Sequence, residues 1–231
     1  MKTYGQFCPF ALTSEIIGER WTPLVLRELM LGRTRFNDIH RGLPRMSPTL
    51  LVRRLARLED AGLVARRRVG PSRMEYGLTE AGRELGPAVV MLADWGKRWL
   101  PATLSKLQAD PDLIMWDMHR RMNLDTLPRS RTVLRFEFSD QPKAKRNRWI
   151  VAEPPEVDLC ITDPGFEVDV FVTTDSRTIT WVWYGDIPLR DAISEGLIDL
   201  HGPRDLCRAF PSWVLLNELA EIPRRRPLRA A

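Results

Sequence analysis

Arginines are concentrated in one segment of the chain, where their number and density would bind a polyanion. Residues 33–73 hold eleven arginines and only three acidic side chains, a local charge of +8. Residues 1–110 carry a net charge of +7, whereas residues 111–231 carry −2. Positive charge of this density attracts nucleic acid phosphates. Charge alone leaves a second interpretation open, in which the arginines form a solvated surface.

One helix in this segment has a pattern that would present arginines to such a partner. Ser47 and Pro48 predict its start, because serine caps a helix and proline suits the first helical position, and the pattern continues to residue 60. A row of leucines at helical spacing predicts an inward face, which leaves the opposite face free to enter a major groove. Arg53 is the first choice for a contact to a base edge. The leucines of the inward row are Leu51, Leu55 and Leu58, and the helix and the segment before it supply the predicted DNA contacts Arg35, Ser47, Thr49, Val52, Arg53 and Arg57.

The elements before this helix must hold it in place. Residues 9–31 predict two helices separated by a Trp-Thr-Pro break, because proline interrupts one helix and suits the start of the next. Residues 34–39 predict a third, short helix that Gly42 and Pro44 end. Two helices and a short third one thus precede the helix over residues 48–60.

A basic hairpin follows that helix. Residues 63–69 and 73–78 predict two strands, with a turn at residues 70–72. Helices followed by such a hairpin form the winged-helix plan, in which Arg67 and Arg73 would lie near phosphates. The helix that starts after residue 79 is apolar enough to be a dimer seam, and its pattern fits an internal core role equally well.

An ordered set of short motifs in residues 8–100 resembles the HxlR-type branch of winged-helix regulators. The motifs are CP at residues 8–9, IGERW at 17–21, GRTRFNDI at 32–39, LARLE at 55–59 with GLV at 62–64, and EYGLTEAG at 75–82. The resemblance implies a homodimer joined by terminal helices, a DNA-reading helix over residues 47–60 and a wing over 66–76. The implied partner is double-stranded DNA carrying a pseudo-palindrome, with half-sites about one helical turn apart or a multiple of it.

The cysteines allow one redox hypothesis. Some proteins that this chain resembles use a cysteine near the N-terminus as a redox switch, and Cys8 falls at that place, just ahead of a predicted helix. A cysteine that is simply buried is the alternative. With Cys160 and Cys207 the chain has three cysteines, an odd number, and none of them are spaced as metal ligands are. Neither a disulfide scaffold nor a metal site is therefore predicted.

The acidic half predicts a second domain of α+β class. Short helices are expected over residues 112–122, 188–195 and 204–219. Strands are expected over residues 132–138, 148–152, 157–162, 168–173 and 178–182. The predicted division is a winged helix-turn-helix domain with a dimerisation helix over residues 1–100, a linker over 101–111, an α+β domain over 112–222 and a basic tail over 223–231.

In the order of its predicted strands and helices and in the sequence of these segments, the region 112–220 is similar to sterol-carrier-protein-like domains. This resemblance implies a small sheet covered by helices and an apolar or lipid-like effector. Aromatic side chains are abundant in this half, and they either line such a cavity or fill the core. Arg135, Arg177 or Arg208 would meet a carboxylate if the effector were an acid. The aromatic residues predicted to bind the effector are Phe136, Phe138, Trp149, Phe171, Trp181, Trp183 and Trp213.

No pattern of an enzyme stands out. The three histidines lack partners at metal or triad spacing, and no glycine-rich phosphate loop is present, so no cofactor and no catalytic site are predicted. The start of the chain lacks a signal peptide and no long apolar run occurs, which predicts a cytoplasmic protein without membrane contact. Two alternatives stay open: a second domain that serves only dimerisation or protein recruitment, and a lipid-binding protein whose basic region meets anionic membrane.

Overall fold

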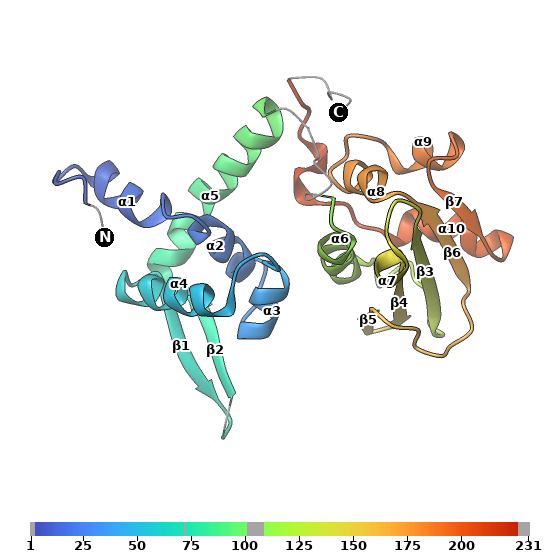
Figure 1. The fold of residues 1–231 in the computed structure, drawn as a ribbon, viewed down its shortest axis with the longest axis horizontal. Coiled ribbons are helices and arrows are strands. Elements are labelled where there is room, and N and C mark those ends of the chain that lie inside the picture. The colour runs from blue at the N-terminus through green and yellow to red at the C-terminus, as the bar shows by residue number, and fades with distance from the viewer. Residues whose placement is uncertain (1–2, 72, 101–108, 226–231) are drawn as a thin grey trace. The chain divides into compact units, whose positions relative to one another are not determined.

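The computed structural model describes residues 3–71, 73–100 and 109–225, and the chain divides into two compact units (Figure 1). The first unit spans Met1–Ala93 and the second Asp94–Ala231. Most of the predicted linker, residues 101–108, lies outside the described residues, as do Ser72 of the predicted turn and residues 226–231 of the predicted tail. No helix within the described ranges is long and apolar enough to cross a membrane.

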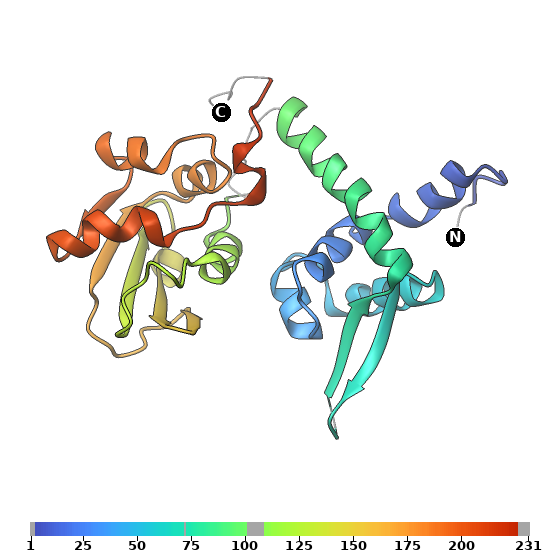
Figure 2. The same cartoon turned by 180° about the vertical axis from the view of Figure 1, so that it is seen from behind.

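The first unit is a winged helix-turn-helix fold, as the sequence predicted. Its strands pair antiparallel, and the hairpin projects beyond the helices in both views (Figures 1 and 2). Ser47 caps α4 as expected, because its hydroxyl accepts a hydrogen bond from the Leu50 amide at 3.2 Å. In chain order the elements are α1 (Pro9–Ile17), α2 (Thr22–Met30), α3 (Phe36–Arg41), α4 (Pro48–Asp60), β1 (Val64–Val69), β2 (Arg73–Leu78) and α5 (Glu80–Trp99), of which residues 80–93 belong to the first unit.

A buried ion pair stiffens the connection between α2 and α3. Arg33 and Glu28 are both almost fully buried and pair with each other, and Arg27 also donates to Glu28 at 2.6 Å. Gly42 allows this arrangement, because a Cβ there would overlap the Glu28 carboxylate. Removing one partner of a buried pair leaves an uncompensated charge, so the segment before α4 is held by charge as well as by apolar packing.

The second unit is α+β, with one mixed sheet in the strand order β5-β4-β3-β6-β7. β3 pairs with β6 in parallel and with β4 in antiparallel orientation. The strands are β3 (Thr132–Phe138), β4 (Asn147–Glu153), β5 (Glu156–Cys160), β6 (Val170–Thr174) and β7 (Asp199–His201). The helices are α6 (Pro111–Met118), η1 (His119–Arg121), α7 (Lys143–Arg146), α8 (Ser176–Trp183), α9 (Leu189–Ser194), α10 (Arg204–Trp213) and η2 (Glu218–Glu221).

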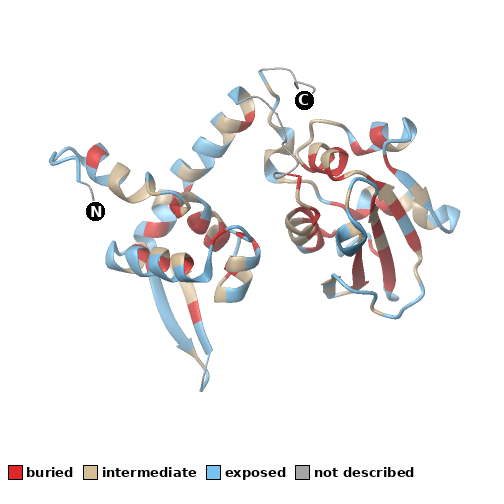
Figure 3. Cartoon of the chain, in the orientation of Figure 1, coloured by how far each residue is buried: buried red, intermediate tan, exposed pale blue. Residues whose placement is uncertain are grey.

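Helices and sheet of this unit share one large core, seen as the buried segments in Figure 3. Leu134 and Phe136 of β3 pack in it with Trp183 of α8 and with Phe210 and Trp213 of α10. Since side chains alternate along a strand, only every second residue of each strand can reach this core. The other set forms the opposite face of the sheet.

The prediction of a strand over residues 178–182 was wrong, because these residues belong to α8. The β-branched residues there favour a strand, but the Asp175 carboxylate caps the helix and accepts hydrogen bonds from the amides of Arg177 and Thr178, each at 2.9 Å. The short strand β7 was not predicted. It has three residues, which is too short for an alternation of polar and apolar side chains to be recognised.

Candidate nucleic-acid interface

The inward face of α4 is the one that the leucine spacing predicted. Leu51, Leu55 and Leu58 are all buried and pack with residues of α2 and α3. Thr49, Val52, Arg53, Ala56 and Arg57 are exposed on the rest of the helix. The predicted contact residues of α4 therefore lie on its solvent-facing side, as does the cap residue Ser47.

Arg53 and its neighbour Arg54 have different surroundings. Arg53 is exposed and makes no ion pair within the described part of the chain, so its guanidinium is available to a partner. The Arg54 side chain is only 13% exposed and pairs with Glu19 from the turn between α1 and α2. Sequence reasoning missed this role of Arg54. At 100° per residue Arg54 falls beside the leucine row, which was the signal that could have revealed it.

Two arginines of the hairpin form ion pairs with the same carboxylate, that of Glu75. Arg67 and Arg73 are exposed, and both contact Glu75, Arg67 at 3.4 Å and Arg73 at 3.1 Å. Arg68 was not among the predicted contacts, yet it is exposed and has no ion pair among the described residues. The wing thus combines two arginines held by Glu75 with a third that is unengaged. Arg35, at the start of α3, is exposed as well.

Cys8 is exposed at the residue before α1, whereas Cys160 and Cys207 are partly buried. Burial raises the pKa of both the Cys160 and the Cys207 thiol, and Asp158 and Asp205 add to the respective rises. A raised thiol pKa lowers the fraction of reactive thiolate. Within the described residues no three metal-binding side chains gather in one place.

The aromatic residues predicted to bind an effector are divided between two faces of the sheet in the second unit. Phe136, Phe138, Trp183 and Trp213 are fully buried in the core between sheet and helices. Trp149 and Phe171 lie on the opposite face, and Trp181 is half-buried on α8 beneath the Arg177 guanidinium, 5.8 Å away. The structure therefore does not bring the seven together. The register of the strands, had it been known, would have separated them.

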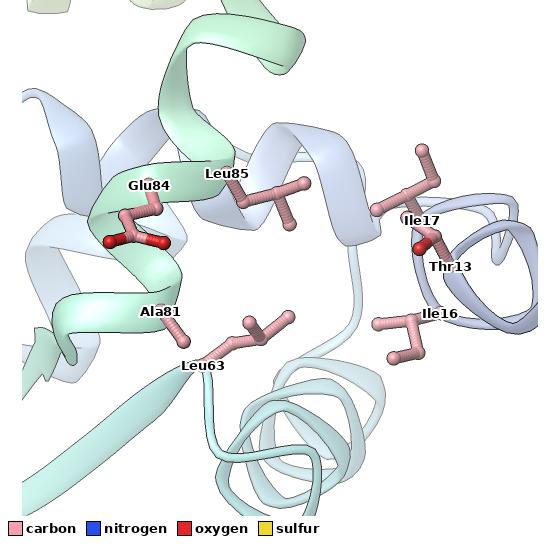
Figure 4. A pocket seen from close by; sticks show the side chains of 7 residues that line it. All are labelled: Thr13, Ile16, Ile17, Leu63, Ala81, Glu84 and Leu85. Atoms are coloured by element: carbon pink, nitrogen blue, oxygen red, sulfur yellow. The ribbon is translucent and has the colours of Figure 1, made fainter. Parts of the chain in front are cut away.

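A groove with a cavity volume of about 290 Å³ lies between α1 and α5 in the first unit (Figure 4). Its walls are mainly apolar, and Figure 4 shows the side chains of α1 facing those of α5 and of the residue before β1 across the opening. The residues that line it are Thr13, Ile16, Ile17, Leu63, Ala81, Glu84 and Leu85.

Comparison with known proteins places the first unit in a family. The HxlR-like helix-turn-helix family matches residues 16–104. An HTH-type transcriptional regulator of Mycobacterium tuberculosis is 47% identical over 89 residues, which are 38% of this chain and 56% of that protein, so the chain spans about half of that relative's length. The solved transcriptional regulator YodB of B. subtilis is 29% identical, with a TM-score of 0.36 and coverage of 40% of this chain and 93% of that one.

The match to the HTH-type transcriptional regulator YdeP of Bacillus subtilis covers a larger share of the relative than the match to the M. tuberculosis protein does. It is 35% identical over 104 residues, which are 44% of this chain and 80% of YdeP. The family match over residues 16–104 contains α4 and the β1–β2 hairpin. The chain belongs to the HxlR family of helix-turn-helix transcriptional regulators.

Proposed function

We propose that this protein is a transcription regulator that binds duplex DNA, with α4 in the major groove and the β1–β2 hairpin along the phosphates. The observation that carries the proposal is the orientation of α4: its leucines are buried, and Arg53 is exposed without an ion pair in the described residues. Arginine reads guanine through two hydrogen bonds, and wing arginines neutralise phosphates without reading sequence.

The test is binding of a labelled duplex by the full chain, first at low and then at rising salt concentration. A duplex enriched from a random pool by the protein itself provides the specific site. Tight binding with a steep, linear loss of log affinity against log salt supports the proposal. Equal affinity for the enriched and a scrambled duplex, or no binding at low salt, would exclude a sequence-reading regulator.

We further propose that the protein acts as a homodimer through α1 and α5. Phe7 and Phe10, before and at the start of α1, are 97% and 80% exposed, and Met91 on α5 is also strongly exposed. Large apolar side chains that are exposed together mark association surfaces. The groove of Figure 4 lies beside α1 and offers a second copy an apolar surface to fill.

Molar mass in solution tests the dimer. Phe10→Asp should shift the mass from dimer toward monomer, since a charge would be buried in the proposed interface. Val52→Asp is the matched control, because Val52 is exposed on α4, away from that surface, so this variant should stay dimeric. A wild-type monomer at micromolar concentration, or a dimer that Phe10→Asp leaves intact, would contradict the proposal.

We also propose that the second unit binds an apolar small molecule that changes DNA affinity, in keeping with its resemblance to sterol-carrier-like domains. A sheet covered on one face by helices and rich in aromatic residues supports this role. Such coupling requires different ligand affinity in two states of the protein, typically by about 1–3 kcal/mol. Screening acidic, neutral and sterol-like compounds for a shift in the DNA binding curve tests it, and no shift with any compound that binds would favour a purely structural second unit.

A further inference from the structure

The face of the sheet that points away from the helices carries its own arrangement of side chains. We call it the outer face, and define it by the row Cys160, Trp149, Arg135, Phe171 and His201, one residue from each of the five strands. Register partners lie side by side, with Cβ atoms about 5 Å apart. Arg135 is the central member of this row, between Trp149 and Phe171.

The Arg135 guanidinium is held against an aromatic ring but is incompletely paired. Its Cζ lies 5.6 Å from the centroid of the Phe171 ring. One terminal nitrogen makes two long contacts, with the Asn147 side-chain oxygen at 3.3 Å and a Glu137 carboxylate oxygen at 3.4 Å. The side chain is 31% exposed, so solvent reaches it.

Two nitrogen donors of this row have no acceptor. Arg135 Nε and Trp149 Nε1 are buried, and neither has a hydrogen-bond partner in the described part of the chain. Trp149 as a whole is only 7% exposed. A buried donor without an acceptor costs free energy, and a donor beside a guanidinium suits an anionic acceptor.

The surroundings of Arg135 are apolar on one side and aromatic on the other. Val133 and Val151 are buried beside Trp149, and Phe171 is 37% exposed next to Arg135. Two carboxylates of this face pair with residues other than Arg135. Glu153 pairs with Arg131 at 3.0 Å, and Asp199 pairs with His201 at 2.9 Å. Asp158 and Glu156 belong to the edge strand β5, and Glu137 is the carboxylate that contacts Arg135, at 3.4 Å.

We propose that the outer face binds a small aromatic carboxylate, with the carboxylate on Arg135 and the ring against Phe171. A carboxylate matches the planar fork of a guanidinium, and it would replace the long contact to Glu137 with two shorter ones. Phe171, which is 37% exposed, would pack against the ring of the ligand. This inference rests on the proposed effector role of the second unit, and it gives that effector a chemical class and a place on the outer face of the sheet.

The test is calorimetry on the full chain without DNA, using 2-naphthoate and the neutral 2-naphthalenemethanol as probes. Naphthoate should bind, and the alcohol should bind at least about tenfold more weakly, because it cannot pair with the guanidinium. Arg135→Gln should weaken naphthoate binding by at least about tenfold. Glu137→Gln should strengthen it several-fold, because a competing carboxylate is removed. Arg190→Gln, a change of an exposed arginine on α9, should leave it unchanged.

Several outcomes would overturn the proposal. One is that the wild type fails to bind naphthoate or binds the alcohol with equal affinity. Another is that the folded Arg135→Gln variant binds naphthoate as tightly as the wild type does, or that the Glu137→Gln variant binds naphthoate more weakly than the wild type. Should Arg135→Gln fail to fold, the Glu137→Gln result and the comparison of the two probes still decide. Because DNA is absent from this experiment, its failure leaves the DNA-binding proposal intact, and a protein that ignores DNA can still bind naphthoate.

Discussion

Replacing Arg53 or Arg54 by alanine should separate DNA recognition from stability within one helix. The two arginines are adjacent in the sequence, but Arg53 is exposed and Arg54 is mostly buried against Glu19. The two variants remove the same charge from the same helix. A difference between them therefore reports what each side chain contacts.

The expected magnitudes follow from these surroundings. Arg53→Ala loses no ion pair within the described residues, and alanine is a good helix former, so the free energy of unfolding should change by less than about 0.5 kcal/mol. A lost guanine contact costs about 1–3 kcal/mol, or roughly 5- to 150-fold in affinity. Arg54→Ala should lower the free energy of unfolding by about 1–2 kcal/mol. The Arg54–Glu19 ion pair is partly buried, so its loss should cost more than that of an exposed pair and less than that of a fully buried one.

The assay combines fluorescence anisotropy on the enriched duplex with urea unfolding of each variant. Arg53→Ala should weaken specific binding and relax the preference at one base position, while the unfolding midpoint stays unchanged. Arg54→Ala should lower the unfolding midpoint and, at temperatures where it is folded, retain the base preference of the wild type. If Arg53→Ala bound with unchanged affinity and preference, the assignment of the α4 face to the DNA groove would be refuted.

Three further results are expected. Leu55→Ala should lower the free energy of unfolding by about 2–5 kcal/mol, because it leaves a cavity in the core of the first unit, and thermal unfolding measures this. Glu75→Gln should release two wing arginines and steepen the salt dependence of DNA binding by roughly one unit for each new phosphate contact, whereas an unchanged slope would mean that the released arginines form no new phosphate contact. In alkylation with iodoacetamide at pH 8, followed by peptide mass spectrometry, Cys8 should react before Cys160 and Cys207, since it is exposed and burial raises the thiol pKa of the other two.

The structure of the first unit was largely predictable because its signals are local. The Ser-Pro start of α4 and its leucine spacing are each complete within a few residues, and the helix begins and ends where the sequence predicted. The hairpin was also predictable, because its two strands flank a Gly-Pro turn. Local signals failed for α8, where β-branched residues favoured a strand and the Asp175 cap decided for a helix.

The sequence by itself determined the helices and the hairpin of the first unit and where positive charge gathers, because these features depend on neighbours along the chain. Only the tertiary structure decided which face each side chain occupies and with which it pairs. Arg54 meets Glu19 across 35 positions, and Phe136 and Phe171 lie on opposite faces of one sheet although both were predicted to bind the same ligand. Such outcomes follow from strand register and from packing between distant segments, which a pattern of adjacent residues does not contain.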